Sequence, residues 1–281
     1  MDLFDYMKEV NEKEDAPLAS RLRPDSLDSI VGQEHILGKD KFLYRAIKAD
    51  KLSSIIFFGP PGCGKTTIAK IIANTTKSNF KQINATTAGK KEMEEAISEA
   101  KISFSMYKKK TILFIDEIGE MDPLLLNKLL KVLEDKRVKF DSAYYDASDP
   151  AVPAYIRKLF AEGAPADFIL IGATTRSPQE INPAIRSRCA EVYFEPLNGT
   201  DIQAIVRNAA HDLSVSLEDG VAEYISEFTV EGRKAINLLA DMYGYAVYKQ
   251  GLGENTVITL EDAKHVVRIG HFIPYAAEKA S

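Results

Sequence analysis

The sequence predicts an α/β fold, in which helices flank a five-stranded parallel sheet and a helical lid follows at the C-terminal end. Five short apolar runs, typical of strands buried on both faces, alternate with segments whose apolar residues recur at helical spacing. Beyond residue 197 the pattern is helical only. We therefore expect an N-terminal tail over residues 1–20, an α/β domain over residues 21–197 and a lid over residues 198–281.

The first strand, residues 55–58, runs into a glycine-rich loop and then into a helical run over residues 66–72. This strand–loop–helix setting is the one that the phosphate-binding pattern G-x-x-x-x-G-K-[ST] requires. Glycines let backbone N–H groups wrap the phosphates, and the helix N-terminus adds partial positive charge. The sequence therefore predicts that the chain binds a nucleoside triphosphate. The residues expected to hold it are Gly59, Pro60, Pro61, Gly62, Cys63, Gly64, Lys65, Thr66 and Thr67.

Specific chemistry is expected of the loop and of a second strand end. Lys65 should neutralise the β- and γ-phosphates, and the Thr66 hydroxyl should ligate Mg²⁺. The apolar run at residues 111–115 leads into Asp116 and Glu117. Ligands bind at the carboxyl edge of open parallel sheets. We expect Asp116 to support the Mg²⁺ ion and Glu117 to polarise the attacking water as a general base.

The remaining elements follow from the same two patterns. Asp122–Pro123 is an expected helix start, because a capping carboxylate precedes proline at the first helical position. Thr200 or Asp201 is expected to start one lid helix, and Ser216, with an acid three residues later, another. The other expected strands and helices cover residues 80–85, 168–173, 191–194, 230–248 and 259–269, with helical stripes at Met93, Ile97, Ala100 and Phe104 and at Leu126, Leu129, Leu130 and Leu133.

Loops at strand ends carry further candidates. Thr174 and Thr175 follow a strand directly and could hydrogen-bond the γ-phosphate or the water. Arg186 and Arg188 fall where a helix is expected to end before the last strand. An arginine supplied by a neighbouring subunit can contribute roughly 10³–10⁵-fold in rate. From spacing alone, ordinary surface arginines remain the favoured interpretation.

Composition narrows the class of protein. The formal net charge of −5 gives no overall basic footprint for nucleic acid, although a local patch such as Lys90–Lys91 could still contact it. No apolar run approaches the roughly 18 residues of a membrane span. Cys63 and Cys189 are expected to be reduced thiols of a cytoplasmic protein. The four histidines show no metal-binding pattern.

Together these motifs resemble the AAA+ ATPase superfamily over nearly the whole chain. The resemblance implies ATP and Mg²⁺ as cofactors, and self-association into a ring, a hexamer or another oligomer. It also implies that Thr174 is the sensor-1 residue, Arg188 an arginine finger acting on a neighbour's ATP, and Arg233 the lid's sensor-2 arginine. The segment over residues 21–33 matches the linker that cups the adenine, with Ile30 and Val31 as its contacts.

The resemblance divides along the chain. Residues 1–118 resemble the bacterial replication-associated recombination ATPase family (RarA/MgsA), which would continue with His-Arg-Phe-Asn after Asp-Glu-Ile, where this chain reads Gly119-Glu120. Residues 113–281 resemble the ATPase part of bacterial B-type Lon proteases. The sequence is therefore expected to be a mosaic joined inside its catalytic strand. The matching stretches are residues 17–24, 31–36 and 83–86 for the first family, and 129–135, 140–145, 163–168, 171–176 and 184–189 for the second.

The effector parts of both families are expected to be missing, so we expect no peptidase activity in this chain. The polymer that the ATPase acts on stays open between unfolded protein and DNA. Tyr144 and Tyr145 lie in a loop-rich insertion of roughly thirty residues. They could grip an unfolded chain, or only pack the insertion against its own sheet. A non-hydrolysing scaffold is the third interpretation, and Asp116, Glu117 and Arg188 argue against it.

Overall fold

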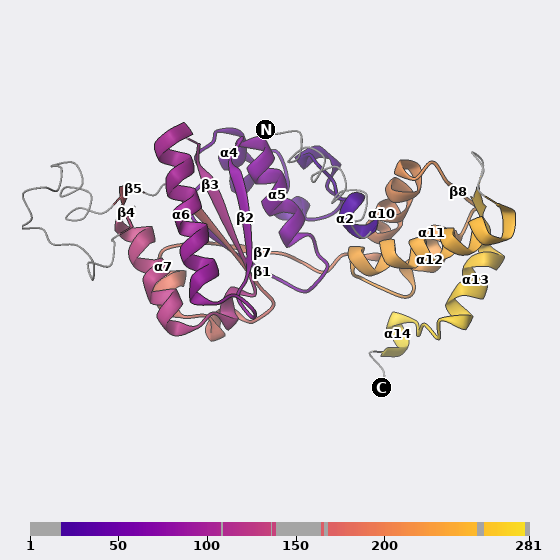
Figure 1. Ribbon diagram of the computed structural model, residues 1–281. Coiled ribbons are helices and arrows are strands. Elements are labelled where there is room, and N and C mark those ends of the chain that lie inside the picture. Colours follow the sequence, from indigo (N-terminus) through magenta and orange to yellow (C-terminus); the bar gives the residue numbers. More distant parts are fainter. Residues whose placement is uncertain are drawn as a thin grey trace, which may run out of the picture. The chain divides into compact units, whose positions relative to one another are not determined.

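A computed structural model describes residues 18–107, 109–135, 137–138, 164–165, 168–251 and 256–278. By their internal contacts the residues form two compact units, which are described one at a time (Figure 1). Of the described residues, those within 35–59 and 68–194 form the sheet unit, and those within 18–34, 60–67 and 195–278 form the helical unit.

The sheet unit is built on five parallel strands in the order β2-β3-β6-β1-β7. The three central strands are buried almost throughout, which explains why their sequences are continuous apolar runs. The predicted five-stranded parallel sheet is confirmed, and each strand lies within one residue of its expected position. The strands are β1 (Ile55–Phe58), β2 (Asn79–Asn84), β3 (Thr111–Asp116), β6 (Phe168–Thr174) and β7 (Ala190–Tyr193).

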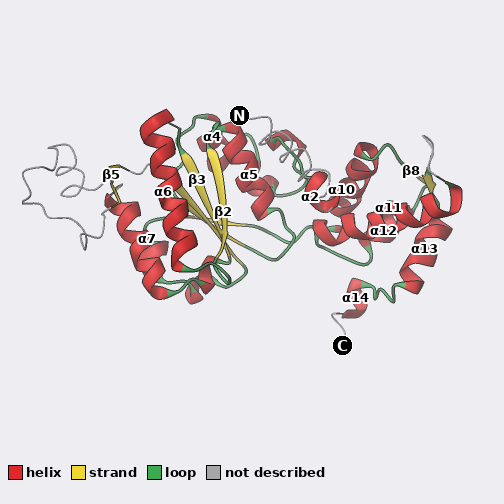
Figure 2. Cartoon of the chain, viewed as in Figure 1, coloured by secondary structure: helices red, strands yellow, loops and turns green. Residues whose placement is uncertain are grey.

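Helices pack on this sheet through the apolar stripes expected from the sequence (Figure 2). Asp122 starts α7 as predicted, because its Oδ1 accepts hydrogen bonds from the backbone N–H groups of Leu124, at 2.9 Å, and Leu125, at 3.1 Å. Leu126 and Leu129 belong to the stripe that this helix buries. The helical segments are α3 (Glu34–Leu37), α4 (Phe42–Lys48), α5 (Lys65–Thr75), α6 (Lys90–Tyr107), α7 (Pro123–Asp135) and α9 (Pro183–Arg186), with a short antiparallel pair, β4 (Arg137–Val138) and β5 (Ala164–Pro165).

The helical unit has its own apolar core between α10, α11, α12 and α13. Residues from near the N-terminus complete this core, since Ala19 is buried in it and Leu22 packs against it. The elements are α2 (Leu18–Arg21), α10 (Gly199–Asp212), α11 (Val221–Ser226), α12 (Gly232–Gln250), α13 (Leu260–Ile269) and α14 (Tyr275–Glu278).

Two expectations for this unit are wrong. The chain beyond residue 197 is not helical only, because β8 (Ser216–Leu217) pairs in parallel with β9 (Val257–Ile258). Ser216 therefore does not cap a helix: its backbone N–H donates to the Thr256 carbonyl at 3.1 Å. The next helix begins only at Val221.

The start of α10 also differs from the expectation. Asn198 is the capping residue instead of Thr200 or Asp201. The Asn198 Oδ1 accepts from the Asp201 N–H at 2.9 Å, and the Asp201 Oδ2 accepts from the Asn198 N–H at 3.0 Å. Asp201 is thus the reciprocal partner of a capping box and not its first residue.

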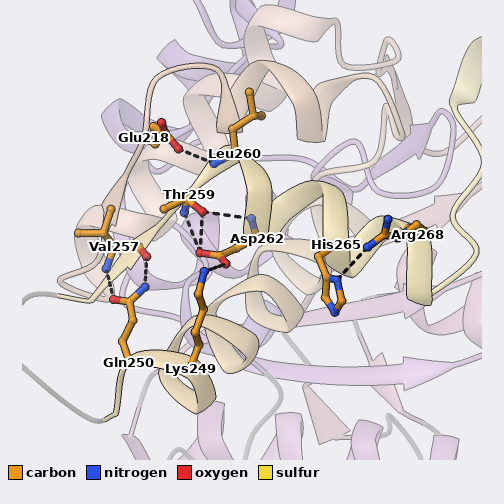
Figure 3. A network of polar contacts seen from close by, with 9 residues as sticks. All are labelled: Glu218, Lys249, Gln250, Val257, Thr259, Leu260, Asp262, His265 and Arg268. Atoms are coloured by element: carbon orange, nitrogen blue, oxygen red, sulfur yellow. Dashed lines mark hydrogen bonds and ion pairs between the residues drawn. The ribbon is translucent and has the colours of Figure 1, made fainter.

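A buried carboxylate organises the start of α13 (Figure 3). Asp262, 1% exposed, accepts hydrogen bonds from the Lys249 ammonium at 2.9 Å and the Thr259 hydroxyl at 2.7 Å. The Thr259 Oγ1 in turn accepts from the Asp262 N–H at 3.1 Å, so Thr259 caps the helix predicted for residues 259–269. Burial acts to raise the pKa of Asp262, but the hydrogen bonds from Lys249 and Thr259 outweigh it and hold the pKa below its ordinary value.

Candidate functional site

The glycine-rich loop leaves the carboxyl end of β1, as the sequence predicted. The Gly59 N–H donates to the Thr174 carbonyl at 3.3 Å, which extends the pairing of β1 with β6 by one residue. Gly59 has a φ of 152°, Gly62 of 70° and Gly64 of 105°. These left-handed backbone angles are ones that L side chains rarely adopt, so the loop shape depends on glycine.

Gly62 and Gly64 differ in how closely other residues surround them. A Cβ on Gly62 would lie 2.6 Å from the Cβ of Glu231, whereas a Cβ on Gly64 would meet nothing within 4 Å. Gly62 therefore allows close approach of the backbone at the start of α12. Gly64 leaves the mouth of the loop open, which suits a ligand that contacts backbone N–H groups.

Lys65 is buried, with 8% of its surface exposed, at the first position of α5. Its ammonium donates to the Pro60 carbonyl at 2.7 Å and lies 4.0 Å from the Cys63 Sγ. The Cys63 thiol donates to the same carbonyl at 3.0 Å, and burial raises the pKa of this thiol. The loop thus curls around a buried ammonium, which acts to lower the pKa of the Cys63 thiol but is outweighed by burial.

Helix α12 is tied to the loop by a backbone hydrogen bond. The Gly232 N–H donates to the Gly62 carbonyl at 3.1 Å. Arg233, the expected sensor-2 residue, is the next residue in the chain and is exposed. The first turn of α12 is therefore anchored to the loop directly beside Arg233.

Gln33 holds the loop from the N-terminal segment. It is 6% exposed, and its amide Nε2 donates to the Glu195 carbonyl at 2.8 Å and to the Cys63 carbonyl at 3.5 Å. Its Oε1 accepts from the Glu195 N–H at 3.1 Å. The expected adenine contacts Ile30 and Val31 lie a few residues earlier and are half-buried.

In the sheet unit, Asp116 and Glu117 lie at the carboxyl end of β3, as predicted. Asp116 is the last residue of the strand, paired in register with Asn84 of β2. Glu117 turns out of the strand in a left-handed conformation, with φ 51° and ψ 48°. Its Oε2 accepts from the backbone N–H and the hydroxyl of Thr175, each at 3.4 Å.

Thr174 ends the neighbouring strand β6 and is fully buried. Its Oγ1 accepts a hydrogen bond from the Arg176 N–H at 3.1 Å. Thr175, one residue on, is exposed and contacts Glu117 as described. The ends of β3 and β6 therefore bring together the acidic pair and the two threonines singled out in the sequence.

The two arginines before β7 have different surroundings. Arg186 donates through Nε to the Glu191 Oε1 at 2.7 Å, and this bond lowers the pKa of Glu191. Arg188 is exposed and donates through Nη1 to the Ala184 carbonyl at 2.6 Å. Burial raises the pKa of the thiol that follows Arg188, Cys189, to about 11. Both arginines thus have partners: Arg186 has a carboxylate and Arg188 a backbone carbonyl.

The donors suit Mg²⁺, which takes oxygen ligands and commonly pairs one or two carboxylates with substrate phosphates. Thr66 offers a half-buried hydroxyl and Asp116 a half-buried carboxylate. Among the residues that the structure describes, no group of three or more His, Cys, Asp or Glu side chains could hold a metal by itself. Neither Thr66 nor Asp116 could hold a magnesium ion alone, so a bound ion would need the phosphates of the nucleotide as further ligands.

Several contacts of the site residues are not apparent from the sequence alone. Neither Gln33 nor Gly232 was assigned a role in holding the loop, and Thr175 was linked to the phosphate or the water instead of to Glu117. Gly62 and Gly119 could have indicated such contacts, because at each position a neighbouring residue lies too close to leave room for a Cβ atom. Tyr144 and Tyr145 lie outside the described residues, as does the side chain of Lys90. Lys91 is exposed and its ammonium lies 3.7 Å from the Glu95 carboxylate.

These features define a P-loop nucleotide-binding protein with a parallel sheet. The sequence profile of the ATPase family associated with various cellular activities (AAA) matches residues 55–197. The chain belongs to this family. A helix long and apolar enough to cross a membrane is not found among the described residues.

Curated relatives come from both families that the sequence resembles, which confirms the two resemblances. Lon protease 2 of Bacillus subtilis is 35% identical over 295 residues, covering 94% of this chain and 52% of that protein. Replication-associated recombination protein A of the same organism is 34% identical over 261 residues, covering 90% of this chain and 53% of that protein. The chain thus spans about half the length of these relatives.

Solved structures with the same fold include the Holliday junction branch migration motor RuvB of Thermotoga maritima. It is 25% identical, with a TM-score of 0.66, over 88% of this chain and 72% of that chain. A single-substitution variant of the same protein superposes with a TM-score of 0.69. The AAA P-loop architecture is therefore shared beyond sequence motifs.

Proposed function

We propose that this chain is an AAA+ ATPase module that hydrolyses Mg-ATP at subunit interfaces and couples hydrolysis to remodelling of a polymer. The observation that carries the proposal is the loop after β1, which combines three left-handed glycines with the buried ammonium of Lys65. A nucleotide phosphate would replace the Pro60 carbonyl as the acceptor for this ammonium. Residues 21–197 would form the ATPase domain, residues 198–281 the lid and residues 1–20 a tail.

Each proposed role follows from the chemistry of the group. Lys65 would neutralise phosphate charge, and Thr66 and Asp116 would hold a Mg²⁺ ion, which would screen the phosphates. Glu117 accepts the proton of the attacking water. The remaining proposed site residues are Thr174 as γ-phosphate sensor, Arg188 as the finger supplied in trans, Arg233 as the lid arginine, and Ile30 and Val31 as adenine contacts.

The proposal is tested by separating binding from turnover. Glu117→Gln should keep ATP binding and lose roughly 10²–10⁴-fold in turnover, because the base is gone while the phosphate contacts remain. Lys65→Ala should weaken ATP binding itself. Equilibrium binding of a fluorescent ATP analogue and steady-state hydrolysis distinguish the two. Turnover of Glu117→Gln close to that of the parent would remove Glu117 from the role of base.

Two polymers remain candidates, an unfolded polypeptide and DNA. One relative is named as a protease and the other as a replication-associated recombination protein. The first candidate makes this chain the unfoldase half of a Lon-like protease, without peptidase activity of its own. The second makes it an ATPase acting on DNA. We favour an unfolded polypeptide, because Asp141, Asp146 and Asp149 flank the tyrosine pair in the sequence and would repel phosphates.

Competing stimulation distinguishes the two polymers. The double variant Tyr144→Ala/Tyr145→Ala should abolish stimulation of ATP hydrolysis by an unfolded protein while basal hydrolysis survives, because tyrosines grip apolar segments. Lys90→Ala/Lys91→Ala is the matched control and should leave this stimulation intact. Stimulation by single-stranded DNA that falls in the lysine variant and ignores the tyrosines would instead support the DNA-acting ATPase.

Location and assembly complete the proposal. Cys63 and Cys189 are free cysteines, as expected of a reducing compartment, so we place the protein in the cytoplasm. A finger that acts in trans requires self-association, so we propose a ring of subunits.

A further inference from the structure

The loop after β3 lies tightly against the end of β6. A Cβ on Gly119 would come within 2.8 Å of the Ile181 Cδ1 and 2.9 Å of the Arg176 Cδ. A Cβ on Gly172, inside β6, would come within 2.7 Å of the Ile118 Cδ1. Neither position leaves room for a methyl group, so the path of residues 118–120 is fixed by packing against β6 and the residues that follow it.

An ion pair adds to this packing. The Arg176 guanidinium contacts the Glu120 carboxylate, and the two side chains are 38% and 41% exposed. The backbone of Arg176 is fixed as well, because its N–H donates to the Thr174 Oγ1 at 3.1 Å. Arg176 therefore links the short helical turn at Ile118–Glu120 to the end of β6.

Glu117 stands at the start of this turn in a conformation that needs support. A left-handed backbone is unfavourable for a residue with a Cβ, and it persists where the surroundings hold it. The carboxylate is held as well, because both polar hydrogens of Thr175 point to its Oε2. Thr175 thus contacts the carboxylate of Glu117, and Arg176 contacts the turn that follows Glu117, both from the residues just after β6.

We propose that Thr175 is a positioning residue for Glu117, and that the Arg176–Glu120 pair holds the turn that carries Glu117. This inference rests on the proposed role of Glu117 as general base. A base acts only within hydrogen-bond reach of the water, and small misplacements of a reacting group cost rate without weakening substrate binding. Thr175 would therefore act on turnover and not on ATP affinity.

The direct test is Thr175→Val, which removes the hydroxyl and keeps the branched shape and the backbone N–H. We expect kcat to fall about 5- to 20-fold while KM and the Kd for ATP stay within about twofold. Thr175→Ser restores the hydroxyl and should recover most of the turnover. In a Glu117→Gln background Thr175→Val should have no further effect, because the carboxylate that it positions is gone.

The ion pair is tested by charge exchange. Arg176→Ala and Glu120→Ala should each lower kcat by about 3- to 10-fold, and Arg176→Glu combined with Glu120→Arg should recover part of the loss. The matched control is Arg207→Ala, which breaks a comparably exposed ion pair with Glu223 away from the proposed site residues. It should leave kcat unchanged. Thermal unfolding midpoints within about 2 °C of the parent exclude global unfolding as the cause.

Failure of this inference and failure of the proposed function give different results. If Glu117→Gln has lost turnover but Thr175→Val keeps it within twofold, the positioning role is overturned and the ATPase proposal stands. If Thr175→Val weakens ATP binding and leaves kcat intact, Thr175 contacts the nucleotide and the inference is overturned. If Glu117→Gln itself keeps turnover, the role of Glu117 fails, and the inference fails with it.

Discussion

The helical unit and the sheet unit fix their functional residues by different means. In the helical unit the glycine-rich loop is held at Gly62 through backbone groups: the Gly62 carbonyl accepts from the Gly232 N–H, and Gly62 leaves room for Glu231. In the sheet unit the acidic strand end is held by side chains, through Thr175 and the Arg176–Glu120 pair. Backbone contacts tolerate many side chains but require glycine, whereas side-chain contacts require particular residue types. The two units should therefore respond differently to substitution.

The largest expected effect concerns Arg188 of the sheet unit. Arg188→Ala should lower turnover by roughly 10³-fold or more, because a finger stabilises charge in the transition state. If it acts in trans, mixing Arg188→Ala subunits with Glu117→Gln subunits should restore turnover where an intact Glu117 meets an intact Arg188. Steady-state hydrolysis over a range of mixing ratios measures this.

Arg186→Ala is the control for that experiment. It removes a partly exposed ion pair with Glu191, for which about 1 kcal/mol of stability is typical, and should keep most of the turnover. Activity of Arg188→Ala that neither depends on protein concentration nor recovers on mixing would show that Arg188 is not a trans finger.

The next largest effect concerns the stability of the glycine-rich loop. It separates the cost of a steric overlap from the cost of a left-handed backbone. Gly62→Ala should destabilise the protein by roughly 2–4 kcal/mol, because the new methyl overlaps Glu231 and the backbone is left-handed. Gly64→Ala meets no neighbour, so only the backbone angle opposes it, at about 1–2 kcal/mol. Urea unfolding of both variants without nucleotide tests the comparison. Equal losses would mean that the contact with Glu231 does not constrain Gly62.

The last expected effect lies in the helical unit, at Asp262, and is smaller than that of Gly62→Ala. Asp262→Asn should cost about 2 kcal/mol, because a charge-assisted hydrogen bond to Lys249 is lost in a buried position. The lowered pKa of Asp262 stabilises the fold above about pH 4, and this contribution disappears as the pH falls through the folded pKa. The variant should therefore lose less stability than the parent on acidification.

Glu261→Gln provides the comparison for Asp262, since Glu261 is an exposed carboxylate beside it on α13. The free energy of unfolding, measured by chemical unfolding at several pH values, should fall on acidification as much in Glu261→Gln as in the parent. An Asp262→Asn variant that is as acid-sensitive as the parent would exclude Asp262 as the source.

Sequence periodicity and motifs predicted the sheet, most of its helices and the loop, because these features depend on short stretches of chain. The β8–β9 pair was missed because Ser216 and Val257 meet only through tertiary structure, and each strand is two residues long. The position of Thr175 beside Glu117 was missed for the same reason: adjacency of β3 and β6 is set by strand order. Residues within a continuous motif could be predicted from the sequence, whereas their contacts with residues from distant segments could not.

The helical unit is assembled from three stretches of chain, and this has a consequence for its synthesis. Residues 35–194, which hold the whole sheet, leave the ribosome before any residue of α10 to α14. Gly232, which binds the Gly62 carbonyl, follows Gly62 by 170 residues (232 − 62). A nascent chain can therefore complete its sheet while its glycine-rich loop still lacks α12, and the loop gains this support only once α12 has been synthesised.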